Sequence, residues 1–126
     1  MFIDTFAWIE YFEGSTKGAK VRAALDATPL AYTSPMVLAE LTSKYTRAHG
    51  AKDAEARVEH VLKHTVLIEH SQQIGVEAGR IHAQLKGKVA GIGLADCFIL
   101  AAARSRQTRV LTGDAHFAEI EDAELL

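Results

Sequence analysis

The sequence is poor in cysteine and proline and has no long apolar run. Its one cysteine, Cys97, excludes an intrachain disulfide and is typical of proteins in a reducing compartment, so we expect a cytoplasmic location. No segment approaches the ~18 consecutive apolar residues of a membrane span, and the first residues lack the pattern of an export signal. The sequence therefore predicts neither a membrane protein nor a disulfide-stabilised secreted one.

An excess of positive charge is also absent. The formal net charge is −2, so a nucleic acid would have to be bound by local basic patches or through metal ions. Apolar residues make up 48% of the chain and charged residues 24%, which indicates a folded globule rather than a disordered chain. At 126 residues, the chain is expected to form one domain over residues 1–126.

Short apolar strands alternate with helices along the chain. Strands are expected over residues 1–4, 30–33, 65–68 and 109–112. Helices are expected over residues 5–12, 17–25, 35–49, 52–63, 72–85 and 94–103, with a last turn at 115–117. This alternation predicts an α/β fold, in which parallel strands form a sheet with helices on both faces.

Among the residues that the chain does contain, four acidic ones are the most informative. Asp4 and Asp114 lie at the carboxyl ends of two predicted strands, and Glu40 and Asp96 interrupt apolar helical turns. An unpaired charge removed from water costs several kcal/mol, and no Lys or Arg lies within three residues of Asp4, Glu40 or Asp96. Because ligands bind at the carboxyl ends of parallel strands, we expect these carboxylates to share a bound cation.

The donor atoms in this set are all oxygens, which favours Mg²⁺ or Mn²⁺ over Zn²⁺. Such a site activates water and stabilises charge on phosphorus during in-line displacement. Thr112, two residues before Asp114, is placed to donate a hydrogen bond to a carboxylate. No Gly-rich phosphate loop of the Walker type is present, so hydrolysis of a phosphodiester is favoured over hydrolysis of a nucleotide.

Four motifs in order resemble those of the PIN-domain family, and most closely of its compact VapC-type toxins. They are Ile3-Asp4-Thr5, Ser34-Pro35 with Ala39-Glu40-Leu41, Leu94–Ala103, and Val110–Asp114 followed by Phe117. The chain departs from the family pattern at Phe6, where a small residue is common, and at Gly113, where a basic or polar one is common.

The resemblance implies a PIN-like three-layer α/β/α fold with a short, mostly parallel sheet. It also implies an endoribonuclease dependent on Mg²⁺ or Mn²⁺, acting as the toxin of a toxin–antitoxin pair. Asp4, Glu40, Asp96 and Asp114 would be metal ligands and catalytic residues, supported by Thr112. The expected partners are an RNA substrate, a cognate antitoxin and a second copy in a homodimer.

Each acidic residue also has a structural interpretation. Asp4 and Asp96 are placed to cap a helix or turn, and Asp114 to cap the turn at 115–117. Glu40 has the spacing of a surface ion pair with Lys44. The four motifs together favour the metal role for Asp4, Glu40 and Asp96, whereas for Asp114 both interpretations stay open.

Several other side chains in the sequence have both a functional and a structural interpretation. Arg104, Arg106 and Arg109 form a basic cluster that either contacts RNA or is a solvated turn. His60 and His64 have chelating spacing but no third ligand, so a solvated helix face is preferred. His116 is interpreted as a surface histidine and Cys97 as a small core residue. The aromatic residues of segment 2–12 are divided between the core and a partner groove or dimer face.

Two other functions fit the same sequence. One is a PIN-domain nuclease of RNA processing or repair that has no antitoxin, and the other is a PIN module that binds without catalysis. The intact Asp4, Glu40 and Asp96 argue against the second. A receiver-like α/β domain is disfavoured because it needs a lysine after a late strand, and no lysine follows Lys88.

Overall fold

The computed structural model describes residues 1–126 as five short strands and six α-helices, with one short 3₁₀ helix, η1. The amino-terminal half contains β1 (Phe2–Ile3), α1 (Thr5–Glu13), α2 (Thr16–Ala27), β2 (Tyr32–Thr33), α3 (Pro35–His49) and α4 (Ala51–His64). The remainder contains β3 (Val66–Leu67), α5 (Gln72–Leu85), α6 (Leu94–Ser105), β4 (Val110–Thr112), η1 (Ala115–Phe117) and β5 (Ala123–Leu125).

The strands form one sheet in the order β3-β2-β1-β4-β5, and all of its pairs are parallel. The first four strands lie where the sequence predicts them, although each is shorter. The fifth was missed, because β5 is three residues long, includes the charged Glu124 and forms only through its register with β4. The sheet is therefore wholly parallel rather than mostly parallel.

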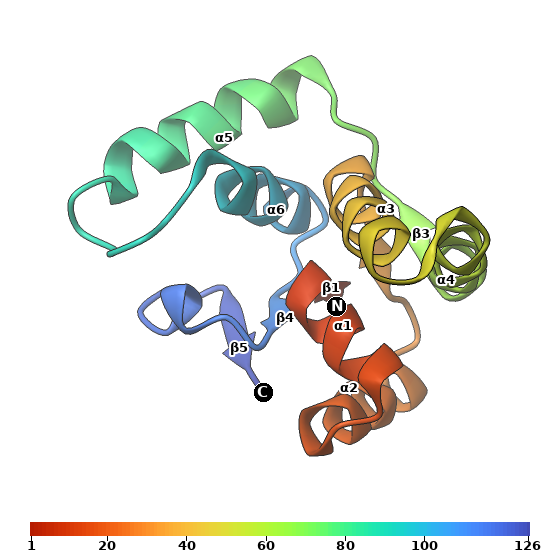
Figure 1. Cartoon of the computed structure of the whole chain (residues 1–126). Helices are drawn as coiled ribbons and strands as arrows, with labels where there is room; N and C mark the ends of the chain where they lie inside the picture. Colours follow the sequence, from red (N-terminus) through yellow and green to blue (C-terminus); the bar gives the residue numbers. More distant parts are fainter.

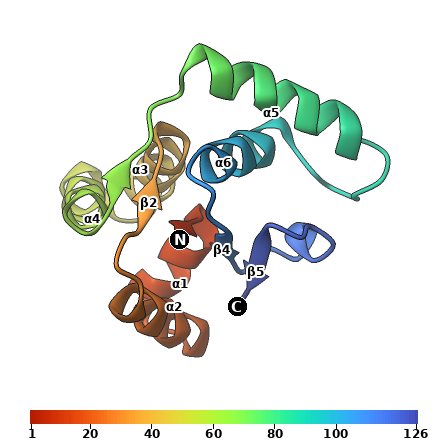
Figure 2. The ribbon, with the colours of Figure 1, turned by 180° about the vertical axis from the view of Figure 1, so that it is seen from behind.

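Helices cover both sides of this sheet. Helices α5 and α6 lie together on one side, whereas α1 and α2 lie on the other (Figures 1 and 2). Helices α3 and α4 form a pair at the end of the sheet that holds β2 and β3 (Figures 1 and 2). The expected three-layer α/β/α architecture is confirmed.

The core consists of the strands and the helix faces turned toward them. Phe2 and Val110 are fully buried in neighbouring strands, and Trp8 and Leu100 are fully buried on helices from opposite layers. Cys97 is also fully buried in this core, where it packs as a small apolar residue, as predicted. None of the helices is both long enough and apolar enough to cross a membrane.

Helix starts follow the capping signals of the sequence with one exception. The side chains of Asp4 and Ser71 accept hydrogen bonds at the starts of α1 and α5. Ser34 occupies the N-cap position of α3 ahead of Pro35, but its hydroxyl is buried and makes no hydrogen bond. The start of α3 therefore relies on the preset φ of Pro35 rather than on a side-chain cap.

The strand order creates a switch point at β1. The chain leaves β1 toward β2 on one side and returns through β4 on the other. In parallel sheets, the crevice outside the carboxyl ends of such strands is the usual ligand site. Asp4 follows β1 and Thr112 ends β4, so both lie at this crevice.

Candidate active site

Asp4 is held at the bottom of the site by two hydrogen bonds. One carboxylate oxygen, Oδ1, accepts from the Thr5 backbone N–H at 2.7 Å, which caps α1. The other, Oδ2, accepts from the Thr112 hydroxyl at 2.6 Å. Thr112 Oγ1 also accepts from the Asp114 backbone N–H at 3.0 Å, so one hydroxyl ties the end of β4 to the end of β1. Asp4 is only 5% exposed, and this network fixes its orientation.

Glu40 reaches the same edge of the sheet from the second turn of α3. Its Oε1 accepts a hydrogen bond from the Thr5 hydroxyl at 2.9 Å. The ion pair with Lys44 that the sequence spacing allows is not formed. Thr5 therefore contacts two predicted ligands, because its backbone N–H binds Asp4 and its hydroxyl binds Glu40.

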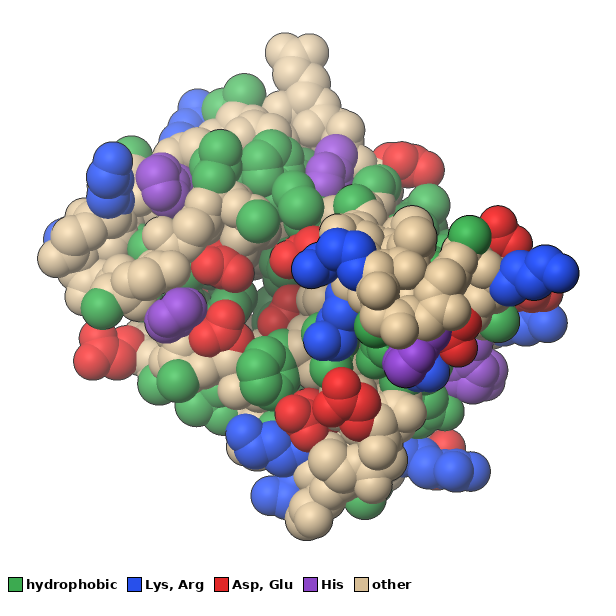
Figure 3. All heavy atoms as spheres, viewed as in Figure 1, with side chains coloured by type: hydrophobic (Ala, Val, Ile, Leu, Met, Phe, Trp, Pro, Cys, Tyr) green, Lys and Arg blue, Asp and Glu red, His purple; other side chains and the backbone are tan.

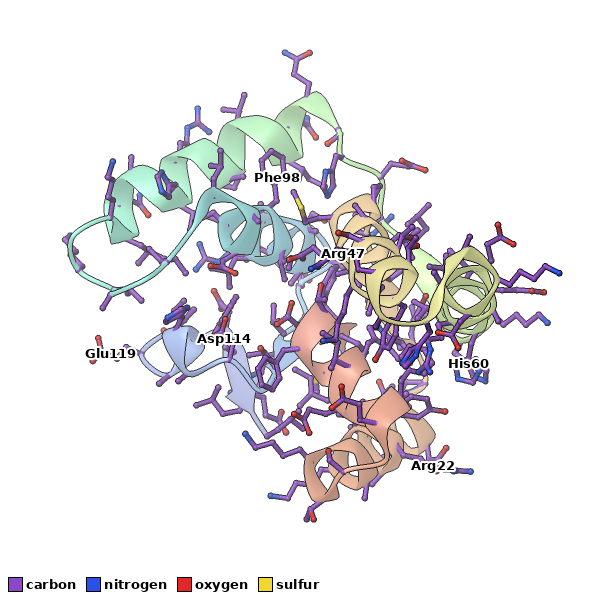
Figure 4. All side chains as sticks on the ribbon, in the orientation of Figure 1. Arg22, Arg47, His60, Phe98, Asp114 and Glu119 are labelled. Atoms are coloured by element: carbon purple, nitrogen blue, oxygen red, sulfur yellow. The ribbon has the colours of Figure 1, made fainter.

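Asp96 and Asp114 approach from the side of α6 and β4. Asp96 lies in the first turn of α6, and its Oδ2 accepts from the Gly93 backbone N–H at 2.9 Å. Asp114 caps η1 through a 2.9 Å hydrogen bond from the His116 N–H, and its Oδ1 lies 3.3 Å from His116 Nδ1. Figure 4 shows Asp114 on the segment after β4, on the side that faces α6.

The capping interpretations of Asp4, Asp96 and Asp114 hold in the structure, yet they do not compete with a site. Each cap uses a hydrogen bond to orient a carboxylate that remains close to its acidic neighbours. Acidic side chains gather around a hollow between α1, α6 and the segment after β4 (Figure 3). Capping thus positions these side chains at the common edge.

The charges of this cluster are not balanced by basic side chains. Asp4, Glu40 and Asp96 take part in no ion pair, and Asp114 pairs only with His116. Burial raises the pKa of Asp4 to about 6, and repulsion by Glu40 and Asp96 adds to this, although the hydrogen bonds from Thr112 and Thr5 act in the opposite direction.

The pKa values of Glu40 and Asp96 are raised by the same effects. Partial desolvation raises the pKa of Glu40 above its ordinary value, and repulsion by Asp96 contributes. Burial likewise raises the pKa of Asp96, with a contribution from the charge of Asp114. The site therefore disfavours its own ionised carboxylates unless positive charge is supplied.

The fit to a divalent cation rests on the donor chemistry. No three acidic, histidine or cysteine side chains are already arranged to enclose a metal ion. The groups at the crevice are carboxylates and hydroxyls, which are hard oxygen donors, and the nearby thiol of Cys97 is buried in the core. These donors suit Mg²⁺ or Mn²⁺, and a bound cation would offset the unfavourable ionisation.

Sequence reasoning missed the bridging role of Thr5. Its position beside Asp4 in the first motif was the only available signal, because the contact with Glu40 depends on how α3 packs against α1. A contact between Phe6 and Gly113, the two departures from the family pattern, was missed for the same reason.

Other groups singled out in the sequence lie away from this crevice. Arg104, at the last turn of α6, pairs with Asp122 at 2.6 Å, and Arg109, just before β4, lies 3.6 Å from Glu124. Both precede the amino end of β4, whereas the carboxylates lie at the carboxyl ends of the strands. The basic cluster therefore lies away from the acidic crevice, and its contact with RNA stays a prediction.

The sequence favours a solvated helix face for His60, but the structure does not place His60 on one. It is partly buried, its Nε2 lies 3.0 Å from the Tyr11 hydroxyl, and its ring stacks on His64 at 4.2 Å between centroids. Figure 4 shows His60 on α4, far to the side of Asp114. The histidine pair is thus part of an aromatic cluster with α1 rather than of the acidic site.

A cavity of about 870 Å³ also lies elsewhere, between β3, α5 and the end of α6. Apolar side chains and three arginines, Arg80, Arg104 and Arg106, line it. It does not include Asp4, Glu40, Asp96 or Asp114. We place the candidate active site at the acidic crevice because the unbalanced carboxylates are there.

Comparisons with known proteins agree with this fold. Similar solved structures include a toxin–antitoxin complex from Klebsiella pneumoniae, with a TM-score of 0.77 at 23% identity over 98% of this chain and 94% of that one. A DNA-bound VapBC from Salmonella typhimurium gives a TM-score of 0.78 at 23% identity over 99% and 95% of the two chains.

VapC20 of Mycobacterium tuberculosis, a toxin that cleaves the sarcin–ricin loop, gives a TM-score of 0.76 at 18% identity over 95% and 94% of the two chains. No curated protein matches the sequence. The PIN domain profile matches residues 1–123. Sequence and fold therefore agree that the chain belongs to the PIN-domain family.

Proposed function

We propose that this chain is an endoribonuclease dependent on Mg²⁺ or Mn²⁺ and the toxin of a toxin–antitoxin pair. The observation that carries the proposal is the meeting of Asp4, Glu40 and Asp96, from three separate elements, at one crevice without a basic partner. Charge of this kind is stabilised by a cation, and hard oxygen donors select the two metals named.

In this proposal Asp4, Glu40 and Asp96 would hold the cation, together with Asp114, directly or through water. A bound divalent cation would lower the pKa of a water molecule and stabilise negative charge on the phosphate group. Thr112 holds Asp4 in place from β4, and Thr5 orients Asp4 and Glu40 together. These hydroxyls fix the carboxylates before the substrate arrives, which lowers the cost of reaching the reactive geometry.

The toxin role is supported by what the proteins with similar solved structures are. Several similar structures are toxin–antitoxin complexes, and one of the similar toxins cleaves a segment of RNA. We therefore propose RNA as the substrate, an antitoxin as a protein partner, and a homodimer in the cytoplasm. A gene for a small DNA-binding protein immediately upstream would support this role over that of an RNA-processing nuclease.

The test is a cleavage assay on mixed cellular RNA with Mg²⁺, Mn²⁺ or EDTA. Asp96→Asn is compared with Asp26→Asn, a matched change at an exposed site on α2. We expect metal-dependent cleavage by the unmodified protein and by Asp26→Asn, and none by Asp96→Asn. Full activity of Asp96→Asn would contradict the proposed site. Absence of cleavage with either metal, from protein free of a co-purifying inhibitor, would favour a binding role.

A further inference from the structure

Phe6 is an exposed aromatic residue directly beside the acidic crevice. It follows Asp4 and Thr5 in the first turn of α1, and 38% of its surface is accessible, whereas its neighbours Phe2 and Trp8 are fully buried. Apolar side chains border the acidic ones around the hollow in Figure 3. The ring is therefore available to a ligand that reaches the carboxylates.

The ring of Phe6 lies against the backbone of Gly113, between Thr112 and Asp114. A Cβ atom at position 113 would lie 2.5 Å from Phe6 Cδ1 and 2.6 Å from Cε1, so only glycine leaves room for the ring. Gly113 does not have a positive φ, so glycine is required there because it has no side chain and not because of its backbone conformation. Phe6 and Gly113 thus form a matched pair that holds the ring next to Asp114.

A positively charged side chain lies close to the ring of Phe6. Lys17, in the first turn of α2, places its ammonium group over the ring of Phe6, 5.7 Å from the ring centroid. Lys17 forms none of the ion pairs in the structure, so its charge is not neutralised by an acidic side chain. An aromatic ring with a cation over it that no carboxylate neutralises suits a nucleotide, because the flexible lysine side chain can turn to a phosphate while a flat base takes its place on the ring.

We propose that Phe6 is a stacking platform for one unpaired base of the RNA, and that Lys17 contacts the adjoining phosphate. This inference rests on the proposed nuclease function, since it describes how the same crevice recognises its substrate. Single-stranded RNA is commonly bound by stacking its bases on aromatic side chains. Since every base has a flat face, Phe6 would favour single-stranded segments over paired ones more than it would favour one base.

The first test measures RNA binding in the non-cleaving Asp96→Asn background with Mg²⁺, using a single-stranded RNA of ten nucleotides and mixed sequence. Phe6→Ala and Phe6→Leu should raise Kd about 5- to 150-fold, the equivalent of ~1–3 kcal/mol for a stacked base. Phe6→Tyr should bind as the parent does. Leu62→Ala, a matched change at an exposed residue on α4, should have no effect.

The second test uses fluorescence. Trp8 is the only tryptophan of the chain and is fully buried, so Phe6→Trp adds a distinct exposed probe. Its emission should be quenched when the same RNA binds, and less so when the RNA is fully paired with its complement. Lys17→Met should weaken binding and lower the slope of log K against log salt by about 0.7, unlike Lys63→Met on α4.

The outcomes separate this inference from the proposed function. Metal-dependent cleavage by the unmodified protein, together with unchanged RNA affinity in Phe6→Ala and Phe6→Leu and no quenching in Phe6→Trp, would overturn the stacking role alone. The exposed ring would then be assigned to a protein contact. Absence of both RNA binding and cleavage in the unmodified protein would overturn both.

Discussion

Asp4 is buried beside two other carboxylates, and this controls its ionisation. Its pKa is raised to about 6, mainly because burial disfavours the charged form. In the unfolded chain the same group titrates near its ordinary value of about 3.9. The folded protein therefore binds a proton more tightly than the unfolded chain between about pH 4 and pH 6.

From this difference we predict that the metal-free protein loses stability as pH rises through that window. The loss is about 3 kcal/mol and is complete above pH 6, because two pKa units correspond to ~2.7 kcal/mol. Asp4→Asn removes the titrating group, so in EDTA at pH 7.5 it should be more stable than the unmodified protein.

Urea denaturation followed by circular dichroism at pH 4.5 and pH 7.5 measures this effect. The advantage of Asp4→Asn should shrink at the lower pH, and Asp26→Asn serves as the control. A difference that is the same at both pH values would show that Asp4 does not titrate as described. The same variant should have lost cleavage, since it lacks the charge of a proposed metal ligand.

Thr112 offers a second test at the scale of one residue. Thr112→Val keeps the shape but removes the hydroxyl that donates to Asp4 Oδ2 at 2.6 Å. We expect cleavage to fall about 10- to 100-fold, as is typical when a group that orients a metal ligand is lost. Thr33→Val is the matched control, because the Thr33 hydroxyl is equally buried but has no hydrogen-bond partner. Equal activity in both variants would remove Thr112 from the site.

At the scale of elements, the contact between α1 and α2 depends on one glycine. A Cβ atom at Gly18 would overlap the carbonyl group of Glu10 in α1. We predict that Gly18→Ala destabilises the protein by about 1–3 kcal/mol, because the helices must move apart. Gly79→Ala in α5 is the control, since nothing lies near its added methyl group. That change should be neutral or stabilising by up to ~1 kcal/mol. Thermal unfolding of both variants decides the point.

The sequence predicted the helices and the central strands well, because their signals are local. Strand β1 leads from a short apolar run into Asp4, and Pro35 marks the start of α3. Strand β5 has no such local signal, since its three residues become a strand only by pairing with β4.

The site was predictable in its residues but not in its contacts. Asp4, Glu40 and Asp96 stand out because each carboxylate lies in an apolar stretch without a nearby basic residue. The hydrogen bond from Thr5 to Glu40 and the packing of Phe6 on Gly113 join segments far apart in sequence, so no local pattern contains them.

At the scale of the whole molecule, the fold gathers charge that it does not neutralise. Asp4 follows β1, Glu40 lies in α3 and Asp96 lies in α6, so the three meet only in the folded state. A cation that binds this cluster must therefore bind the native protein and not the unfolded chain. It should stabilise the fold in proportion to its affinity. The raised pKa values of all three carboxylates are the mark of a site that gains from such a cation.

Isothermal titration with Mn²⁺ at pH 7.5 tests this claim most directly. We predict saturable binding to the unmodified protein and to Asp26→Asn, and an affinity at least ~10-fold lower for Asp96→Asn, which lacks one ligand charge. No Mn²⁺ binding to the unmodified protein, or the same affinity in Asp96→Asn, would contradict the assignment of the acidic crevice as a metal centre.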